Sequence, residues 1–185
     1  MNLSNDTRLN MYWFILLARR LDEFAWSLHR ERKIVFHMSG IGHEAIQVGA
    51  AFAMRAGTDW VAPYYRDMAL MLTLGLTPLE YLLGLYGKRN DPVSGSRQMP
   101  EHWGLKRSNV ISSSSTSAAQ TSQAVGIAQA IRLQAGDQVV LNCTGEGATA
   151  QGGWYESVNW ASLHKLPIVF LVENNLYLHL YILIN

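Results

Sequence analysis

Cysteine is almost absent from this sequence of 185 residues, in which Cys143 is the single example. One cysteine cannot form an internal disulfide, which fits a reducing compartment. Because Cys143 ends the apolar run Val139–Cys143, its position favours a small buried residue over a nucleophile. Charge is also scarce: charged residues make up 16% of the chain and the formal net charge at pH 7 is +1. This balance argues against nucleic acid or an anionic membrane as a partner.

Long hydrophobic runs are missing as well. The apolar stretch Met11–Ala18 is ended by Arg19 and Arg20, far short of the roughly 20 residues that cross a bilayer. The N-terminus does not follow the basic, then apolar, then small-residue order of a secretion signal. The sequence therefore predicts a cytoplasmic protein, or one of the mitochondrial matrix if its source is eukaryotic.

Apolar residues at helical spacing, and residues that can begin a helix, predict several helices in the first half of the chain. The polar stretch Gly87–Asn109 is long for a connection in a compact chain, and such loops are usually functional or mobile. We expect helices at Asn5–Glu31, Glu44–Ala56, Asp67–Leu76 and Pro78–Tyr86, and an extended segment at Thr58–Pro63.

The last third of the chain alternates between helix and strand patterns. Two nearly continuous apolar runs, each preceded by a helix pattern, are typical of a parallel sheet covered on both faces. The fold class is therefore α/β, with a parallel sheet flanked by helices and an N-terminal helical segment. The expected elements are helices at Gln120–Leu133 and Trp154–Leu163, strands at Gln138–Cys143 and Ile168–Glu173, and a glycine-rich turn at Thr144–Gly153.

Polar residues follow both of these strands. Gly145-Glu146-Gly147 comes after the first, and Asn174-Asn175 ends the second. Ligands of open α/β sheets sit beyond the carboxyl ends of the strands. Glycines let backbone N–H groups approach an anion, and carboxylate and amide oxygens suit Mg²⁺. Each motif alone is more often an ordinary turn, but the two together on neighbouring strands predict a site for magnesium and diphosphate.

A dinucleotide-binding fingerprint is the alternative for this turn. That fingerprint needs Gly-x-Gly-x-x-Gly at the opening of the helix. The chain has Gly145 and Gly147 but Ala150 at the third position, which weakens the alternative.

The segment Gly145–Thr149, some 30 residues before Asn175, resembles the thiamine-diphosphate signature. The resemblance extends over nearly the whole chain, from about residue 10 to Tyr177. The chain resembles the α subunit of 2-oxo acid dehydrogenases. Within that family, Gly95–Gly104 resembles the branched-chain (2-oxoisovalerate) enzyme more than the pyruvate enzyme. Other matching segments are Gly42–Ala45, Pro63–Asp67, Gln123–Gly126 and Trp154–Phe170.

Carried over position by position, the resemblance implies thiamine diphosphate and Mg²⁺ as cofactors. The metal ligands would be Glu146, Asn175 and the backbone carbonyl of Tyr177. The residues implied to line the path of the diphosphate and the thiazolium ring are Gly145, Gly147 and Ala148.

Four further residues are implied at the same site. Tyr65 and Arg66 match a pair that reaches the diphosphate, a role that suits the forked donors of arginine. Ser115 matches a serine that contacts the cofactor, and His102 lies near the site and is our candidate catalytic residue. The alternatives are a surface ion pair for Arg66 and a solvated loop residue for His102.

The resemblance implies oxidative decarboxylation of a branched-chain 2-oxo acid, with transfer of the acyl group to a lipoyl arm. The expected partners are the β subunit, in an α2β2 heterotetramer, and the lipoyl domain of the acyltransferase component. Pyruvate or acetoin dehydrogenase α subunits are the alternatives, as is a non-catalytic remnant.

The chain departs from the family pattern at two places. Family members run to roughly twice this length, so we expect residues 1–185 to be the N-terminal part of a single domain, from a truncated or frameshifted reading of a longer gene, inactive alone. The segment Ser114–Gln120 lacks a proline and a threonine of the family pattern, so the resemblance does not extend to the potassium site of some members.

Overall fold

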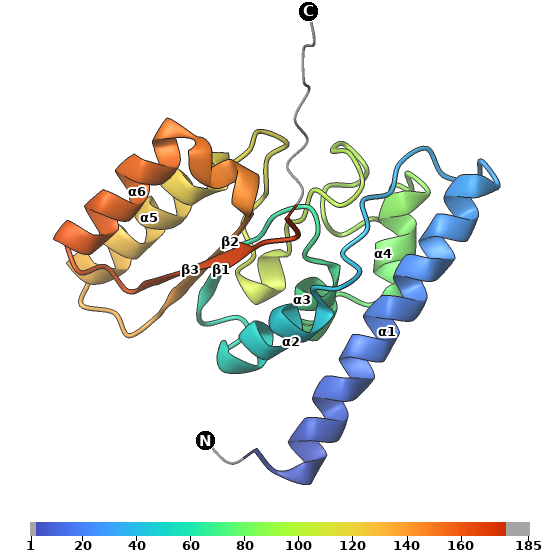
Figure 1. Cartoon of the computed structure of the whole chain (residues 1–185), viewed down its shortest axis with the longest axis horizontal. Helices are drawn as coiled ribbons and strands as arrows, with labels where there is room; N and C mark the ends of the chain where they lie inside the picture. The colour runs from blue at the N-terminus through green and yellow to red at the C-terminus, as the bar shows by residue number, and fades with distance from the viewer. Residues whose placement is uncertain (1–2, 177–185) are drawn as a thin grey trace, which may run out of the picture.

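A sheet of three parallel strands lies at the centre of the structure, a computed structural model that describes residues 3–176 (Figure 1). Its strands are β1 (Trp60–Ala62), β2 (Val140–Gly145) and β3 (Ile168–Glu173). They lie in the order β1-β2-β3, and both neighbouring pairs are parallel. Helices flank the sheet on both sides (Figure 1). The predicted α/β class, with its N-terminal helical segment, is confirmed.

Helices α5 (Ala119–Leu133) and α6 (Gly152–Leu163) cover one face of the sheet. Small side chains allow these helices to lie close to the strands, because alanine adds little thickness to the interface. The buried residues of this cluster are Ala62, Ala124, Val125, Ala128, Ile131, Val140, Ala161 and Leu166. The helix α6 connects β2 to β3, as the alternation of patterns in the last third predicted.

The other face of the sheet packs on the N-terminal helices. These are α1 (Asn5–Arg30), α2 (Glu44–Ala53), α3 (Met68–Thr73) and α4 (Pro78–Leu85). Leu141 and Cys143 alternate with Val140 along β2 and therefore face this second cluster, to which both belong. Cys143 is fully buried, as its apolar run predicted.

The element boundaries agree with the sequence patterns to within a few residues. Ser4 rather than Asn5 caps α1, because its Oγ accepts the N–H of Thr7. The second helix ends at Ala53 because the backbone of Met54 is extended. The sequence did not predict the 3-10 turns at Lys106–Ser108 and Glu146–Ala150.

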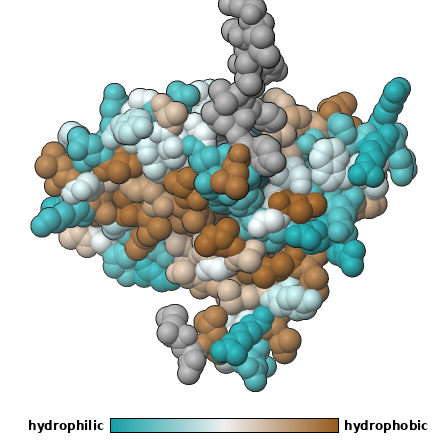
Figure 2. Space-filling model, in the orientation of Figure 1, coloured by the Kyte–Doolittle hydropathy of each residue, from teal (hydrophilic) through white to brown (hydrophobic). Residues whose placement is uncertain are grey.

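The expectation that both strands of the last third are covered on both faces is wrong for β3. This strand is at the edge of the sheet, and its residues Val169 and Val172 are 52% and 37% exposed. Figure 2 shows hydrophobic side chains gathered on the side of the molecule where β3 lies in Figure 1. By contrast, β2 and the short β1 are buried along most of their length. Among residues 3–176, no helix combines the length and hydropathy needed to cross a membrane.

Candidate functional site

The carboxyl ends of the three strands meet at one edge of the sheet, because all three strands are parallel. Arg66 follows β1, Glu146 follows β2, and Asn175 follows β3. The sequence predicted the second and third of these positions as neighbours. It did not predict that β1 also joins the sheet in parallel, with Trp60 paired to Val140, which brings Arg66 to the same edge.

A cavity of about 380 Å³ lies at this edge. Its walls come from the three strand ends, from the connection before α2 and from the segment before α5. Every predicted site residue within the described part of the chain lines it; Tyr177 lies outside the described residues. The predicted residues in the wall are Tyr65, Arg66, His102, Ser115, Gly145, Glu146, Gly147, Ala148 and Asn175.

Glu146 and Asn175 are in contact at the ends of the central and edge strands. The backbone N–H of Asn175 lies 3.4 Å from Oε2 of Glu146. The neighbouring Asn174 uses its Oδ1 within its own turn, where it accepts the N–H of Leu176. Asn175, and not Asn174, lines the cavity. Both residues line the cavity, and their side chains carry oxygen atoms of the hard kind that Mg²⁺ prefers.

Arg66 presents a cation to the cavity. Its Nη1 donates to the carbonyl of Ser39 at 2.7 Å, and its guanidinium lies 5.2 Å from the centroid of the Tyr65 ring. None of the ion pairs between residues 3–176 includes Arg66. The alternative of a surface salt-bridge residue is therefore not met, and the charge is available to an anion.

His102 and Ser115 form a hydrogen-bonded pair in the cavity wall. Nδ1 of His102 lies 3.1 Å from the carbonyl of Pro100, and Nε2 lies 2.5 Å from Oγ of Ser115. A carbonyl can only accept, so Nδ1 carries the proton and, in the neutral ring, Nε2 accepts from the hydroxyl of Ser115. His102 is only 6% exposed, which contradicts the alternative of a solvated loop histidine.

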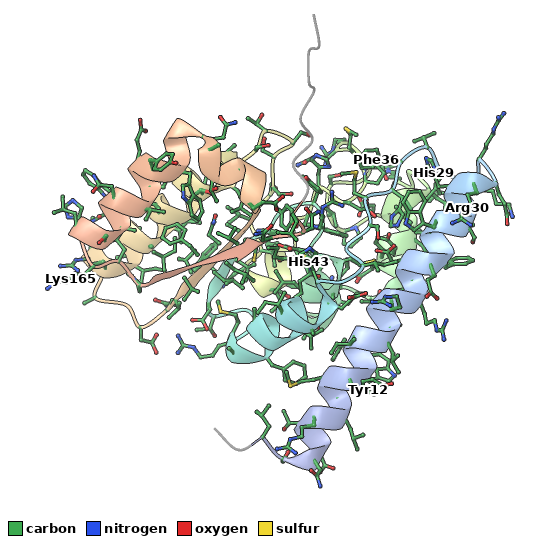
Figure 3. All side chains as sticks on the ribbon, in the orientation of Figure 1. Tyr12, His29, Arg30, Phe36, His43 and Lys165 are labelled. Carbon is green, nitrogen blue, oxygen red and sulfur yellow. The ribbon has the colours of Figure 1, made fainter. Side chains whose placement is uncertain are left out.

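Several residues of the cavity wall were not predicted as site residues. Phe36 and Met38 come from the connection between α1 and α2, and Met99 comes from the loop before His102; Figure 3 labels Phe36. These apolar side chains carry no motif that would mark them. Gln120 is different: its Nε2 donates to the carbonyl of Cys143, whereas its buried Oε1 has no partner among the described residues. An acceptor left open beside the cavity favours a bound donor.

A buried pair of acids lies directly behind the cavity. Asp67 follows Arg66, Glu173 ends β3, and their carboxyl groups approach one another beside the thiol of Cys143. Burial, and then the charge of Glu173, raises the pKa of Asp67 well above its usual range. The raised pKa favours the protonated form of Asp67 beside the carboxylate of Glu173. Burial likewise raises the pKa of Cys143, so its thiol stays neutral.

Gln47 and His43 connect this pair to α2. Nε2 of Gln47 donates both to Oε2 of Glu173, at 2.8 Å, and to the carbonyl of Arg66, at 3.1 Å. Nδ1 of His43 lies 3.5 Å from the same Oε2, and Figure 3 shows His43 at the start of α2 near the end of β3. These contacts fix the segments that carry Arg66 and Asn175 relative to one another.

The fold and the cavity define an α/β protein with a ligand site at the carboxyl edge of a parallel sheet. Residues 12–178 match the family described as dehydrogenase E1 component. The chain belongs to this family.

Three curated relatives illustrate the similarity. The chain is 44% identical over 177 residues to 2-oxoisovalerate dehydrogenase subunit alpha of Bacillus subtilis (strain 168), a match that covers 96% of this chain and 54% of that protein. The mitochondrial 2-oxoisovalerate dehydrogenase subunits alpha of Mus musculus and Homo sapiens are 34% and 33% identical over 177 residues, with 95% of this chain and 39% of each relative covered. The chain spans about half the length, or less, of these relatives.

Proposed function

We propose that this chain carries the thiamine-diphosphate and magnesium site of a branched-chain 2-oxo acid dehydrogenase α subunit, the decarboxylating component. One observation carries the proposal: Arg66, Glu146 and Asn175 reach one cavity from the ends of three parallel strands. The chain resembles relatives that are named 2-oxoisovalerate dehydrogenase subunits alpha, and this resemblance supports a branched-chain 2-oxo acid as the substrate. Residues 1–185 would form the N-terminal part of a single domain.

The residues of the cavity wall fit this cofactor. They combine side-chain oxygens that suit Mg²⁺, the cation of Arg66, and an acceptor, Oε1 of Gln120, that has no partner among the described residues. Glu146 and Asn175, together with the carbonyl of Tyr177, would hold Mg²⁺, and Arg66 would neutralise the diphosphate. When bound, thiamine diphosphate supplies the carbon nucleophile and the electron sink for decarboxylation of the 2-oxo acid. The flanking residues Tyr65, Gly145, Gly147, Ala148, Ser115 and His102 would position it.

The proposal implies partners. A β subunit, in an α2β2 heterotetramer, would complete the site, and a lipoyl domain of the acyltransferase component would receive the acyl group. The compartment proposed is the cytoplasm, or the mitochondrial matrix in a eukaryote, the location given in the names of the mouse and human relatives.

Calorimetric titration with thiamine diphosphate and Mg²⁺ tests the proposal, with and without a β subunit. Glu146→Ala should weaken binding by at least about tenfold, the lower end of what losing even an outer partner of a metal ligand costs. Glu156→Ala is the matched control, because Glu156 is an exposed glutamate on α6 outside the cavity. It should leave binding unchanged.

Three results of this titration would contradict the proposal. Binding that survives Glu146→Ala would remove the metal role of this carboxylate. No binding by the wild-type chain, even with a β subunit, would leave a non-catalytic remnant. Preference for NAD over thiamine diphosphate would favour a nucleotide-binding domain.

A further inference from the structure

Glu101 adopts a backbone conformation that is unusual for a residue with a side chain. Its φ is +64°, in the left-handed region, and the residue is only 6% exposed. A Cβ destabilises this conformation, which glycine adopts freely. Contacts elsewhere must therefore hold Glu101 in place, and Glu101 immediately precedes His102 of the cavity wall.

The carboxylate of Glu101 provides those contacts. Its Oε1 accepts from Nδ1 of His37 at 2.6 Å and from the hydroxyl of Tyr81 at 2.9 Å. Its Oε2 accepts the backbone N–H of Met38. One side chain thus joins α4 and the connection between α1 and α2 to the loop that carries His102.

His37 is the centre of this network. Its side chain is fully buried, and its Nε2 lies 3.1 Å from Oδ1 of Asp22 on α1. Oδ2 of Asp22 accepts in turn the N–H of Gly40. Burial lowers the pKa of His37, but hydrogen bonds and charges of Asp22 and Glu101 outweigh it and raise the pKa to about 9. At neutral pH the ring is therefore a cation between two carboxylates.

We propose that Glu101 is a positioning residue: clamped by His37, it fixes His102 against Ser115 in the wall of the cavity. The network also holds a second residue of that wall, since Met38, whose backbone N–H donates to Glu101, lines the cavity together with His102. No motif in the sequence marks His37, Asp22 or Glu101 for this role. The consequence for cofactor binding depends on the proposed function; the geometry of His102 does not.

Nitrogen-15 NMR of the labelled chain tests the positioning role, since long-range correlations of each imidazole report its tautomer. In the wild type, His102 should show a single tautomer with the proton on Nδ1. Glu101→Gln and Glu101→Gly should both shift His102 towards averaged tautomers. The glutamine keeps an oxygen that can accept from His37, whereas the glycine relieves the backbone strain. Glu156→Gln, at the exposed glutamate of α6, is the control. His37→Gln and His102→Gln assign the signals.

The outcomes separate this inference from the proposed function. If His102 signals in both Glu101 variants match those of Glu156→Gln, Glu101 is structural only and the inference is overturned. If they shift, and thiamine diphosphate with Mg²⁺ binds about tenfold more weakly, as is typical for loss of an outer partner, both proposals are supported. If they shift while the wild type binds no thiamine diphosphate, the positioning role stands and the proposed function fails.

The same network predicts a pH dependence of stability. The groups that face His37 among the described residues are Asp22 from α1, Tyr81 from α4 and Glu101. Because the folded pKa of about 9 exceeds the ordinary 6.5, the stabilisation is complete below pH ~6.5 and is lost as pH rises through about 9. Chemical unfolding of the wild type and His37→Gln should therefore converge at alkaline pH; a constant difference from pH 6 to 10 would contradict this.

Discussion

Gly40→Ala should disrupt the cavity and destabilise the chain together. A Cβ at Gly40 would stand 2.4 Å from the carbonyl oxygen of Arg66, a backbone atom that cannot move aside alone. The segment that carries Arg66 must shift, and overpacking of this kind costs about 1–3 kcal/mol. We expect a free energy of unfolding lower by about 2 kcal/mol. We also expect the chain that remains folded to bind thiamine diphosphate with Mg²⁺ more weakly than the wild type does. Urea unfolding and calorimetry measure the two effects.

Gly49→Ala is the matched control for this substitution. Gly49 lies within α2, and a Cβ there would meet nothing within 4 Å. Replacing a helical glycine by alanine should instead stabilise the chain by roughly 0.5–1 kcal/mol. Equal effects of the two substitutions would show that the clash with Arg66 does not govern the site.

Glu173→Ala should be the more damaging of two changes in the buried acid pair. It leaves the buried Nε2 of Gln47 without the carboxylate that it contacts, and it removes the acid that lies beside the buried Asp67. Removing one partner of a buried charged network typically costs about 3–5 kcal/mol. We expect the free energy of unfolding to fall by about 3 kcal/mol, together with loss of cofactor binding, because Glu173 directly precedes Asn174-Asn175. Denaturant unfolding at pH 7 measures the loss.

Asp67→Asn separates the protonation of Asp67 from its packing. The amide oxygen can still accept the N–H of Tyr64, as Oδ2 of Asp67 does at 2.9 Å, and the amide N–H can donate to Glu173. Because the pKa of Asp67 is raised in the folded chain, its stabilising contribution is complete below the unfolded value near ~3.9 and is lost as pH rises towards the folded value. The variant should therefore gain stability relative to the wild type as pH rises above 4. A pH-independent difference would contradict the raised pKa of Asp67.

Much of the fold follows from local pattern. The strand at Ile168–Glu173 and the helices at each side of β2 were predicted because periodicity and length are properties of short segments. The proximity of Glu146 and Asn175 also followed, since parallel neighbours end at one edge of a sheet. The exposure of the edge strand β3 did not follow. Apolar composition shows that a strand can be buried, and it does not show that this chain buries it.

The contacts that organise the cavity were beyond sequence reasoning. His37 and Glu101 are 64 positions apart, and Gln47 and Glu173 are 126 apart. Nothing in the local sequence of His37 distinguishes a buried cation between carboxylates from an exposed histidine. The left-handed backbone of Glu101 is likewise unexpected, because that conformation is usually marked by glycine.

The sequence by itself determined the α/β class, the order of helices and strands, and the polar residues that end the last two strands. These depend on side-chain type and spacing along a few residues. Only the tertiary structure decided that β1 pairs in parallel with β2 and so brings Arg66 to Glu146 and Asn175. Only it decided which buried acid has a raised pKa and which histidine carries a charge, because desolvation and charge at those positions come from segments far apart in the chain.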